Sequence, residues 1–359
     1  MITPNSYMNP EYTQAERDRV SEYMSSGAWI MEHKLTRELE DKICEYTNST
    51  HAHMVTSATA GLHIAAMIAG IQPGVKFAAS AYTQAATVNG AISLGGVPCF
   101  VDIDHTSCTI DFKKIPPDCG VVFVTSINGR LGKDTTEEII KLQSQGVMVI
   151  EDSAQSLGSF HDGKHVGTLG DMGVFSFGAP KMITTGQGGC IITDCDDISD
   201  QIKAIKNFGR TVADGEIYNT MGLNYKFTDL QAAFGLGQFE RLQEIVDHKK
   251  QIYEWYRTHL KGHEAVFVDT NLHTTAPIYP EILILNRTKV MESLKLNNIG
   301  YRMAYQPLTQ QPFHSQFDQA RLHAARFIGR TGLHLPSQHS LTYADVSHIS
   351  EIVKRGILC

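Results

Sequence analysis

The sequence predicts an α/β protein whose large domain carries a mostly parallel, seven-stranded sheet flanked by helices, followed by a smaller α+β domain. Two observations predict this fold class. Short apolar runs alternate with helix-like stretches up to about residue 194, and the pattern changes after about residue 228. The chain has 359 residues, 42% apolar and 19% charged, which is enough for about two domains. We expect residues 1–235 to form the large domain and residues 236–359 the small one.

Seven apolar runs are the expected strands of the large sheet: residues 53–57, 76–80, 98–103, 121–126, 147–152, 173–177 and 189–194. Several of them are apolar almost throughout, which is typical of strands that are buried on both faces. The last two runs are too close together for a helical crossover, so we expect them to pair locally in antiparallel fashion.

Helices are expected between these runs and after them. Residues 59–69, 84–94 and 135–144 are helix-like, and the third stretch opens with Thr-Thr-Glu-Glu, a good helix start. Residues 228–260 predict one long helix, capped at its start by Thr228 and Asp229 and punctuated by Gly235 and Gly237. The small domain is then expected to hold a strand over 279–285, a helix over 288–298 and a closing helix near 343–355.

Charge and composition exclude several classes of partner. A net charge of −7 argues against nucleic acid or an anionic membrane as the main partner. No apolar run approaches the ~20 residues that cross a bilayer, and the first residues do not resemble a signal peptide, so we expect a cytoplasmic protein. Seven scattered cysteines fit free thiols. His51 and His53 form a His-x-His pair without a nearby carboxylate or cysteine, so we expect no metal site.

Polar residues follow two of the most apolar runs. Asp152 ends one of them, where a carboxylate is either a helix cap or a ligand contact. Ser176 ends another, and Lys181 follows it beside a glycine-rich turn at 184–189. A lone lysine after a strand is usually a solvated surface residue. In open α/β sheets, however, ligands bind at the carboxyl ends of the strands. The combination therefore favours an anionic, nitrogen-containing cofactor.

Residues 56–61 offer a second binding feature, because a strand there runs into a helix through small residues. Free backbone N–H groups at a helix start are a ready phosphate site. Small hydroxyl residues are common at such junctions, so the signal is weak by itself. The segment is neither a Walker A loop nor a Gly-x-Gly-x-x-Gly motif.

Taken together, these segments resemble the sugar aminotransferases of the DegT/StrS type, which have the fold of aspartate aminotransferase, pyridoxal-phosphate fold type I. The resemblance covers nearly the whole chain and depends on the order and spacing of its motifs. The matching stretches are residues 26–29, 57–63, 95–102, 151–158, 167–171, 176–189, 222–233 and 333–337.

The resemblance implies a role for each site residue. Lys181 would hold pyridoxal 5′-phosphate through a Schiff base and then move protons at the substrate carbon. Asp152 would pair with the protonated pyridine nitrogen, and Gln155 would touch the phenolic oxygen of the ring.

The resemblance also implies how the phosphate is held. Ser176 and the backbone N–H groups of Ala58 and Thr59 would bind it. Asn224 would reach the phosphate of the neighbouring subunit's cofactor, so the resemblance implies a homodimer with sites at the subunit interface.

Four positions depart from the family pattern. The phosphate turn usually reads Gly-Thr and here has Ala58, which does not readily adopt φ > 0. The residue that stacks on the cofactor ring is usually aromatic, and here it is Gln84, unless Tyr82 takes that role. Asn128 replaces a tyrosine and Gln187 replaces a glutamate. We expect the last two to influence substrate choice.

The resemblance implies transfer of an amino group, with glutamate as donor, onto a keto sugar, most often a nucleotide-linked 4-keto-6-deoxyhexose. Such enzymes serve deoxyamino-sugar and polysaccharide biosynthesis. The departures at Asn128 and Gln187 keep open a smaller phosphorylated ketone or a cyclitol as acceptor. A related sugar dehydratase would have histidine in place of Lys181. A catalytically silent regulatory protein is a further alternative, which the presence of both Lys181 and Asp152 opposes.

Overall fold

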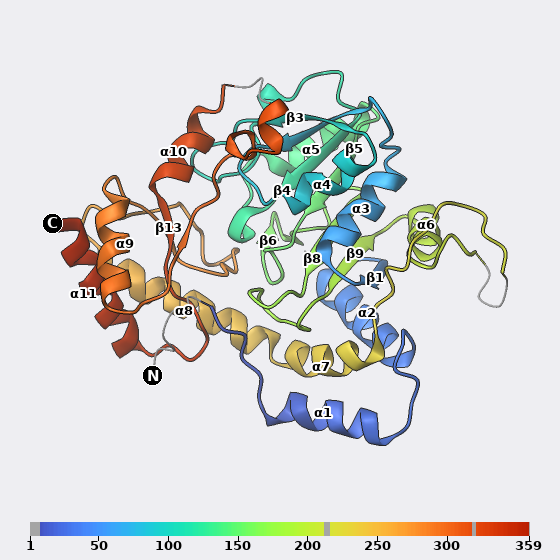
Figure 1. The fold of residues 1–359 in the computed structure, drawn as a ribbon, viewed down its shortest axis with the longest axis horizontal. Coiled ribbons are helices and arrows are strands. Elements are labelled where there is room, and N and C mark those ends of the chain that lie inside the picture. Colours follow the sequence, from blue (N-terminus) through green and yellow to red (C-terminus); the bar gives the residue numbers. More distant parts are fainter. Residues whose placement is uncertain (1–7, 212–215, 318–320, 359) are drawn as a thin grey trace.

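The computed structural model describes residues 8–211, 216–317 and 321–358. Its large sheet has the strand order β1-β9-β8-β5-β4-β2-β3 (Figure 1). The strand β9 is antiparallel to both of its neighbours, and the other pairs are parallel. The predicted fold class and the antiparallel pairing of the last two runs are therefore confirmed. The strands are β1 (His51–Val55), β2 (Lys76–Ser80), β3 (Val97–Val101), β4 (Val121–Thr125), β5 (Met148–Asp152), β8 (Met172–Ser176) and β9 (Gly189–Thr193).

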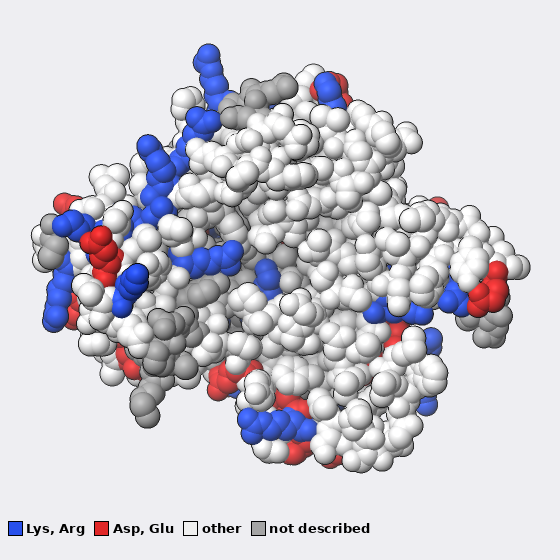
Figure 2. All heavy atoms as spheres, in the orientation of Figure 1, with Lys and Arg blue, Asp and Glu red and all other residues white. Residues whose placement is uncertain are grey.

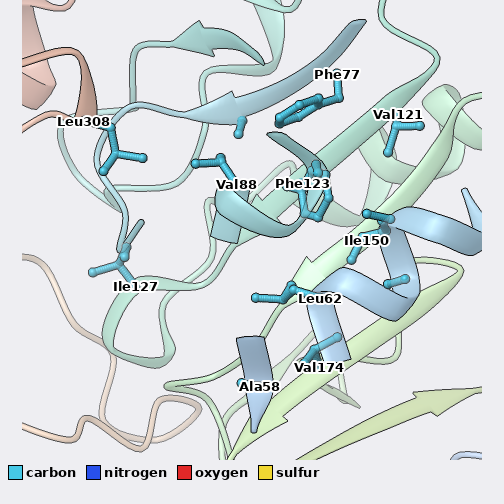
Figure 3. Packing of buried hydrophobic residues seen from close by; sticks show 14 of the residues in the cluster. Ala58, Leu62, Phe77, Val88, Val121, Phe123, Ile127, Ile150, Val174 and Leu308 are labelled. Atoms are coloured by element: carbon cyan, nitrogen blue, oxygen red, sulfur yellow. The ribbon is translucent and has the colours of Figure 1, made fainter. Parts of the chain in front are cut away.

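Successive side chains of each strand point to opposite faces of this sheet, so both faces carry apolar side chains. Helices cover each of the two faces. On one face, Phe123 and Val174 pack under α3 (Ala58–Ile68), α4 (Ala86–Ser93) and α6 (Asp196–Lys206). Figure 3 shows this cluster, with Leu62 of α3 above Val174. On the other face, Val124 packs under α5 (Thr135–Ser144), and Phe175 lies in the apolar cluster of α2 (Lys34–Thr47) and α7 (Asp229–Glu240).

The helix predicted over 228–260 is two helices, so this prediction is wrong in one respect. The helix α7 ends at Glu240, and α8 (Leu242–Leu260) begins after Arg241, which has φ −99° and ψ 4°. The two glycines do not end the helix. A Cβ atom on Gly235 would lie 2.8 Å from Thr185, and one on Gly237 would lie 2.9 Å from Glu16 of α1 (Gln14–Ser25). They let α7 approach its neighbours closely.

The C-terminal part is a second, four-stranded antiparallel sheet with the order β10-β11-β13-β12. Its strands are β10 (Val266–Phe267), β11 (Glu281–Leu283), β12 (Arg302–Met303) and β13 (Gly332–His334). Its helices are α9 (Arg287–Leu296), α10 (His323–Thr331) and α11 (Tyr343–Leu358). The remaining elements are a hairpin, β6 (Phe160–His161) with β7 (Lys164–His165), and the 3₁₀ turns Phe112–Lys114, Ile127–Gly129, Leu308–Gln310 and His314–Phe317.

The helix α8 connects the two sheets. Its first turns, with Leu242 and Ile245, belong to the apolar cluster of the large sheet, whereas Ile252 and Tyr256 belong to that of the small sheet. The division at residue 235, which stays a prediction, falls within α7, and α8 is the element that the two parts share. No helix in residues 8–211, 216–317 and 321–358 is long and apolar enough to cross a membrane.

Candidate active site

Asp152 ends β5, and Lys181 follows β8, its parallel neighbour, at the same edge of the large sheet. Asp152 is only 5% exposed. Its Oδ2 accepts a hydrogen bond from the Thr87 hydroxyl at 2.6 Å, and its Oδ1 accepts one from the Ala154 amide at 3.2 Å. Burial raises the pKa of this carboxyl, and the charge of Lys181 acts in the opposite direction. A cationic group such as a protonated pyridine nitrogen would stabilise the ionised form, so the site fits the predicted cofactor.

Lys181 is partly buried in the segment that follows β8, and its amide donates to the Gly178 carbonyl. Burial lowers the pKa of its amine to about 8, with Arg302 adding to the effect and Asp152 opposing it. A lysine with a depressed pKa carries a larger neutral fraction, which is the form that attacks a carbonyl group. Figure 2 shows basic side chains at the hollow between the small part, on the left, and the large part. The lowered pKa of Lys181 therefore suits the predicted role of this lysine in holding the cofactor.

The start of α3 forms a cradle with β9. The Ser57 hydroxyl caps the helix by accepting from the Ala60 amide at 3.1 Å. The amides of Ala58 and Thr59 are the first two of the helix and have no intrahelical acceptor, which suits a phosphate. Across from them, a Cβ atom on Gly189 would lie 2.4 Å from the Ala58 nitrogen. Only glycine permits this approach.

Ser176 completes the cradle, because it is paired with Gly189 across the β8–β9 ladder. Its half-buried hydroxyl accepts from the Gly178 amide at 3.4 Å. The structure thus brings together the residues predicted to hold the phosphate, Ser176 on one side of Gly189 and Ala58 on the other. Ala58 is helical and does not have a positive φ, so the departure from glycine at this position carries no strain.

Two glutamines were predicted to contact the cofactor ring. Gln84 is exposed just before α4, the helix that carries Thr87. Tyr82, its competitor for the stacking role, is fully buried and donates its hydroxyl to Glu281 at 2.8 Å. Tyr82 is therefore not available to stack, and Gln84 remains the candidate. Gln155 is held by hydrogen bonds to both the oxygen and the nitrogen of its amide.

A family model described as the DegT/DnrJ/EryC1/StrS aminotransferase family matches residues 10–354. The chain belongs to this family. The resemblance stated from the sequence is therefore confirmed, together with pyridoxal phosphate as the cofactor and aminotransferase as the class of enzyme.

Individual proteins support the same assignment. The chain is 30% identical to the GDP-perosamine synthase of Escherichia coli O157:H7 over 96% of each chain. The structure of DesI with its TDP-sugar product superposes with a TM-score of 0.89 at 26% identity, covering 99% of this chain and 93% of that one. The PLP form of the putative sugar aminotransferase Spr1654 from Streptococcus pneumoniae shares the fold, with a TM-score of 0.92 at 21% identity over 99% of each chain.

Two of the departures from the family pattern have different surroundings. Asn128 is fully buried, with φ +54°, and its side chain binds the backbone of the 278–279 segment: Oδ1 accepts from the Ile278 amide and Nδ2 donates to the Tyr279 carbonyl, both at 2.8 Å. Asn128 therefore acts on the site through the backbone rather than by facing an acceptor. The Gln187 side chain is exposed on the glycine-rich turn. The backbone carbonyl of Gln187 accepts a hydrogen bond from the Gln231 side chain.

Asn224 is exposed and forms an isolated β-bridge with Asn207. Its predicted contact with a neighbouring subunit's cofactor stays a prediction. His51 and His53 are engaged elsewhere, by Asp196 and Ser199. In the part of the chain that the structure describes, no group of three or more His, Cys, Asp and Glu side chains is placed to hold a metal ion.

Sequence reasoning missed the partners that hold these residues in place. Thr87 is the second residue of α4, and its hydrogen bond to Asp152 joins residues 65 positions apart. Arg302 acts on Lys181 from the small sheet. Neither residue lies in a motif, so no local signal in the sequence identifies them.

Proposed function

We propose that this protein transfers an amino group from glutamate to a nucleotide-linked 4-keto-6-deoxyhexose. The observation that carries the proposal is the placement of the buried Asp152 carboxylate and the reactive Lys181 amine at one sheet edge, next to a phosphate cradle. The nature of the sugar is supported by the similar proteins, a GDP-perosamine synthase and a protein solved with a TDP-sugar product.

Each residue has a defined task in this proposal. Pyridoxal phosphate, when bound, supplies an electron sink for the carbon that carries the amino group. The Asp152 carboxylate would keep a proton on the pyridine nitrogen, the Ser176 hydroxyl and the amides of Ala58 and Thr59 would bind the phosphate, and Gln84 would lie against the ring. The neutral Lys181 amine would move a proton from the donor carbon to C4′ of the cofactor and, in the second half of the reaction, from C4′ to the sugar carbon that receives the nitrogen. Its depressed pKa makes this exchange accessible near neutral pH.

The direct test is an amino-transfer assay on a panel of acceptors. The purified protein, loaded with pyridoxal phosphate, is given glutamate and one of several nucleotide-linked keto sugars. Formation of 2-oxoglutarate and the mass of the aminated sugar are measured. The proposal expects turnover with a nucleotide-linked 4-keto-6-deoxyhexose and none for Lys181→Ala. Turnover confined to small phosphorylated ketones or cyclitols would assign the protein to that other class of acceptor.

We further propose that the protein is a homodimer in which the subunits share their sites. Large apolar side chains are exposed on two segments, Trp29 and Ile30 on one and Ile217 and Met221 on the other. The second segment leads directly to Asn224. Such concentrated apolar exposure is typical of a surface that a second subunit covers.

The mass in solution tests the homodimer. Trp29→Glu is expected to give a monomer with weakened cofactor binding, by light scattering and absorbance. Ile140→Glu, which changes an exposed apolar residue of α5, is the control and should stay dimeric. A wild-type protein that is active as a monomer would refute the shared site.

A further inference from the structure

The amide of Gln155 has a fixed orientation. Its Oε1 accepts from the Asn128 backbone amide at 2.7 Å and from the Tyr279 hydroxyl at 3.1 Å. A backbone N–H can only donate, so the atom that faces it must be the oxygen. The Nε2 group therefore points the other way, where it donates one hydrogen to the Tyr305 hydroxyl at 2.9 Å. Its second hydrogen has no acceptor among the described residues and is the one that can reach a ligand.

The two donors that fix Gln155 belong to different parts of the molecule. Asn128 lies in the turn after β4 of the large sheet. Tyr279 comes just before β11 of the small sheet, about 120 residues later in the chain than Gln155. The orientation of the amide thus depends on how the small sheet is seated against the large one.

The Tyr279 ring is itself clamped. It stacks on the ring of His334 with centroids 3.8 Å apart and planes 21° apart. His334 Nε2 lies 3.3 Å from Glu281 Oε1, and both residues are fully buried. Glu281 in turn accepts from the Tyr82 hydroxyl and pairs with the buried Arg130 guanidinium.

This clamp joins the two sheets. Tyr82 and Arg130 follow strands of the large sheet, whereas Glu281 and His334 are residues of β11 and β13. A buried carboxylate with an arginine partner holds its geometry well, because either group alone would be strongly disfavoured there. The clamp therefore gives Tyr279 a fixed place from which to donate to Gln155.

We propose that Tyr279 is a positioning residue, which orients the Gln155 amide so that an Nε2 hydrogen faces the phenolic oxygen of the cofactor, and that stacking on His334 holds the Tyr279 ring for this purpose. The inference rests on the proposed function, since it concerns the cofactor of that site. Tyr279 acts only through Gln155 and does not itself touch the reacting atoms.

The test compares Tyr279→Phe, Gln155→Ala and the double variant with the wild type. Tyr279→Phe removes only the hydroxyl and keeps the ring on His334. One hydrogen bond contributes about 0.5–1.5 kcal/mol, so kcat/KM should fall about two- to tenfold. The pH midpoint of the visible absorption band of the bound cofactor should move in the same direction as in Gln155→Ala. Because Tyr279 acts through Gln155, adding Tyr279→Phe to Gln155→Ala should change neither quantity further.

The matched control is Tyr256→Phe. Tyr256 is also fully buried, and its hydroxyl has no hydrogen-bond partner within the described residues. It should leave the absorption band and kcat/KM unchanged, and thermal unfolding of all variants checks that they remain folded.

The outcomes separate the two proposals. A wild-type band midpoint and wild-type kcat/KM in Tyr279→Phe, or effects that multiply in the double variant, would overturn the role of Tyr279 and leave the proposed function standing. A wild-type protein that binds no pyridoxal phosphate would overturn the proposed function itself.

Discussion

The capture of pyridoxal phosphate by the apoenzyme should follow a pH midpoint near the pKa of Lys181, about 8. An ordinary lysine has a pKa of about 10.4. At pH 7 about one amine in eleven is then neutral, against about one in 2,500 for an ordinary lysine. Since only the neutral amine attacks the carbonyl, the site should capture the cofactor about 200 times faster at this pH than an unperturbed amine with the same access.

Two substitutions test the causes of the shift. Asp152 raises the pKa of Lys181 and Arg302 lowers it, although burial is the largest cause. Asp152→Asn should therefore move the midpoint of capture to lower pH, and Arg302→Met should move it to higher pH. Each substitution should move the midpoint by less than burial lowers the pKa of Lys181, because burial is the largest cause of that lowering and each charge is a smaller one.

Stopped-flow absorbance of apoenzyme mixed with pyridoxal phosphate, over about pH 6 to 10, measures the rate, and borohydride fixes the product to show that Lys181 has reacted. Asp200→Asn is a suitable control, since this exposed carboxylate pairs with Lys203 on α6. A midpoint at or above about 10 would show that Lys181 is not desolvated and refute the reasoning. Shifts of the two variants in the same direction would refute the opposing charges.

Two further predictions concern the scaffold. Glu281→Gln leaves the buried Arg130 guanidinium without its partner and should lower the free energy of unfolding by about 3–5 kcal/mol, whereas Arg130→Met with Glu281→Leu should recover much of it. Because the pKa of Glu281 is lowered, its contribution is complete at neutral pH and lost only as pH falls through that low value, so denaturant unfolding at pH 7 measures it. Gly189→Ala would bring a Cβ atom to 2.4 Å from the Ala58 nitrogen, so it should weaken pyridoxal-phosphate binding about tenfold or more in a fluorescence titration. Gly120→Ala, whose Cβ atom would meet nothing within 4 Å, should bind like the wild type; equal affinities of the two variants would contradict the cradle.

The strands of the large sheet could be predicted from the sequence because each is marked locally. An apolar run of five or six residues needs burial on both faces, whatever lies elsewhere in the chain. The break at Arg241 could not be predicted in this way. The sequence on both sides of Arg241 is helix-like. The two helices diverge because they pack on different neighbours: α7 packs on α1 and α2, whereas α8 packs on α11. Packing of this kind has no local signature.

The reactive residues were similarly marked by their positions at strand ends, whereas their supports were not. Asp152 ends one apolar run and Lys181 follows another, so the sheet itself brings them together. Tyr279, Glu281 and Arg130 reach the same centre through contacts between residues more than 100 positions apart. A single sequence contains no information on such pairs until the fold is known.

The departures from the family pattern change the scaffold more than the reacting centre. Asn128 exchanges hydrogen bonds with the backbone at Tyr279, so its effect is to seat the segment that orients Gln155. Gln187 is exposed, and water screens any charge at that position. Arg302 and Tyr305 differ from Asn128 and Gln187, because they act on the site residues directly. Arg302 lowers the pKa of Lys181, and the Tyr305 hydroxyl accepts a hydrogen bond from Gln155. The influence of Asn128 and Gln187 on substrate choice therefore stays a prediction, whereas we expect substitutions of Arg302 and Tyr305 to change Lys181 and Gln155 themselves.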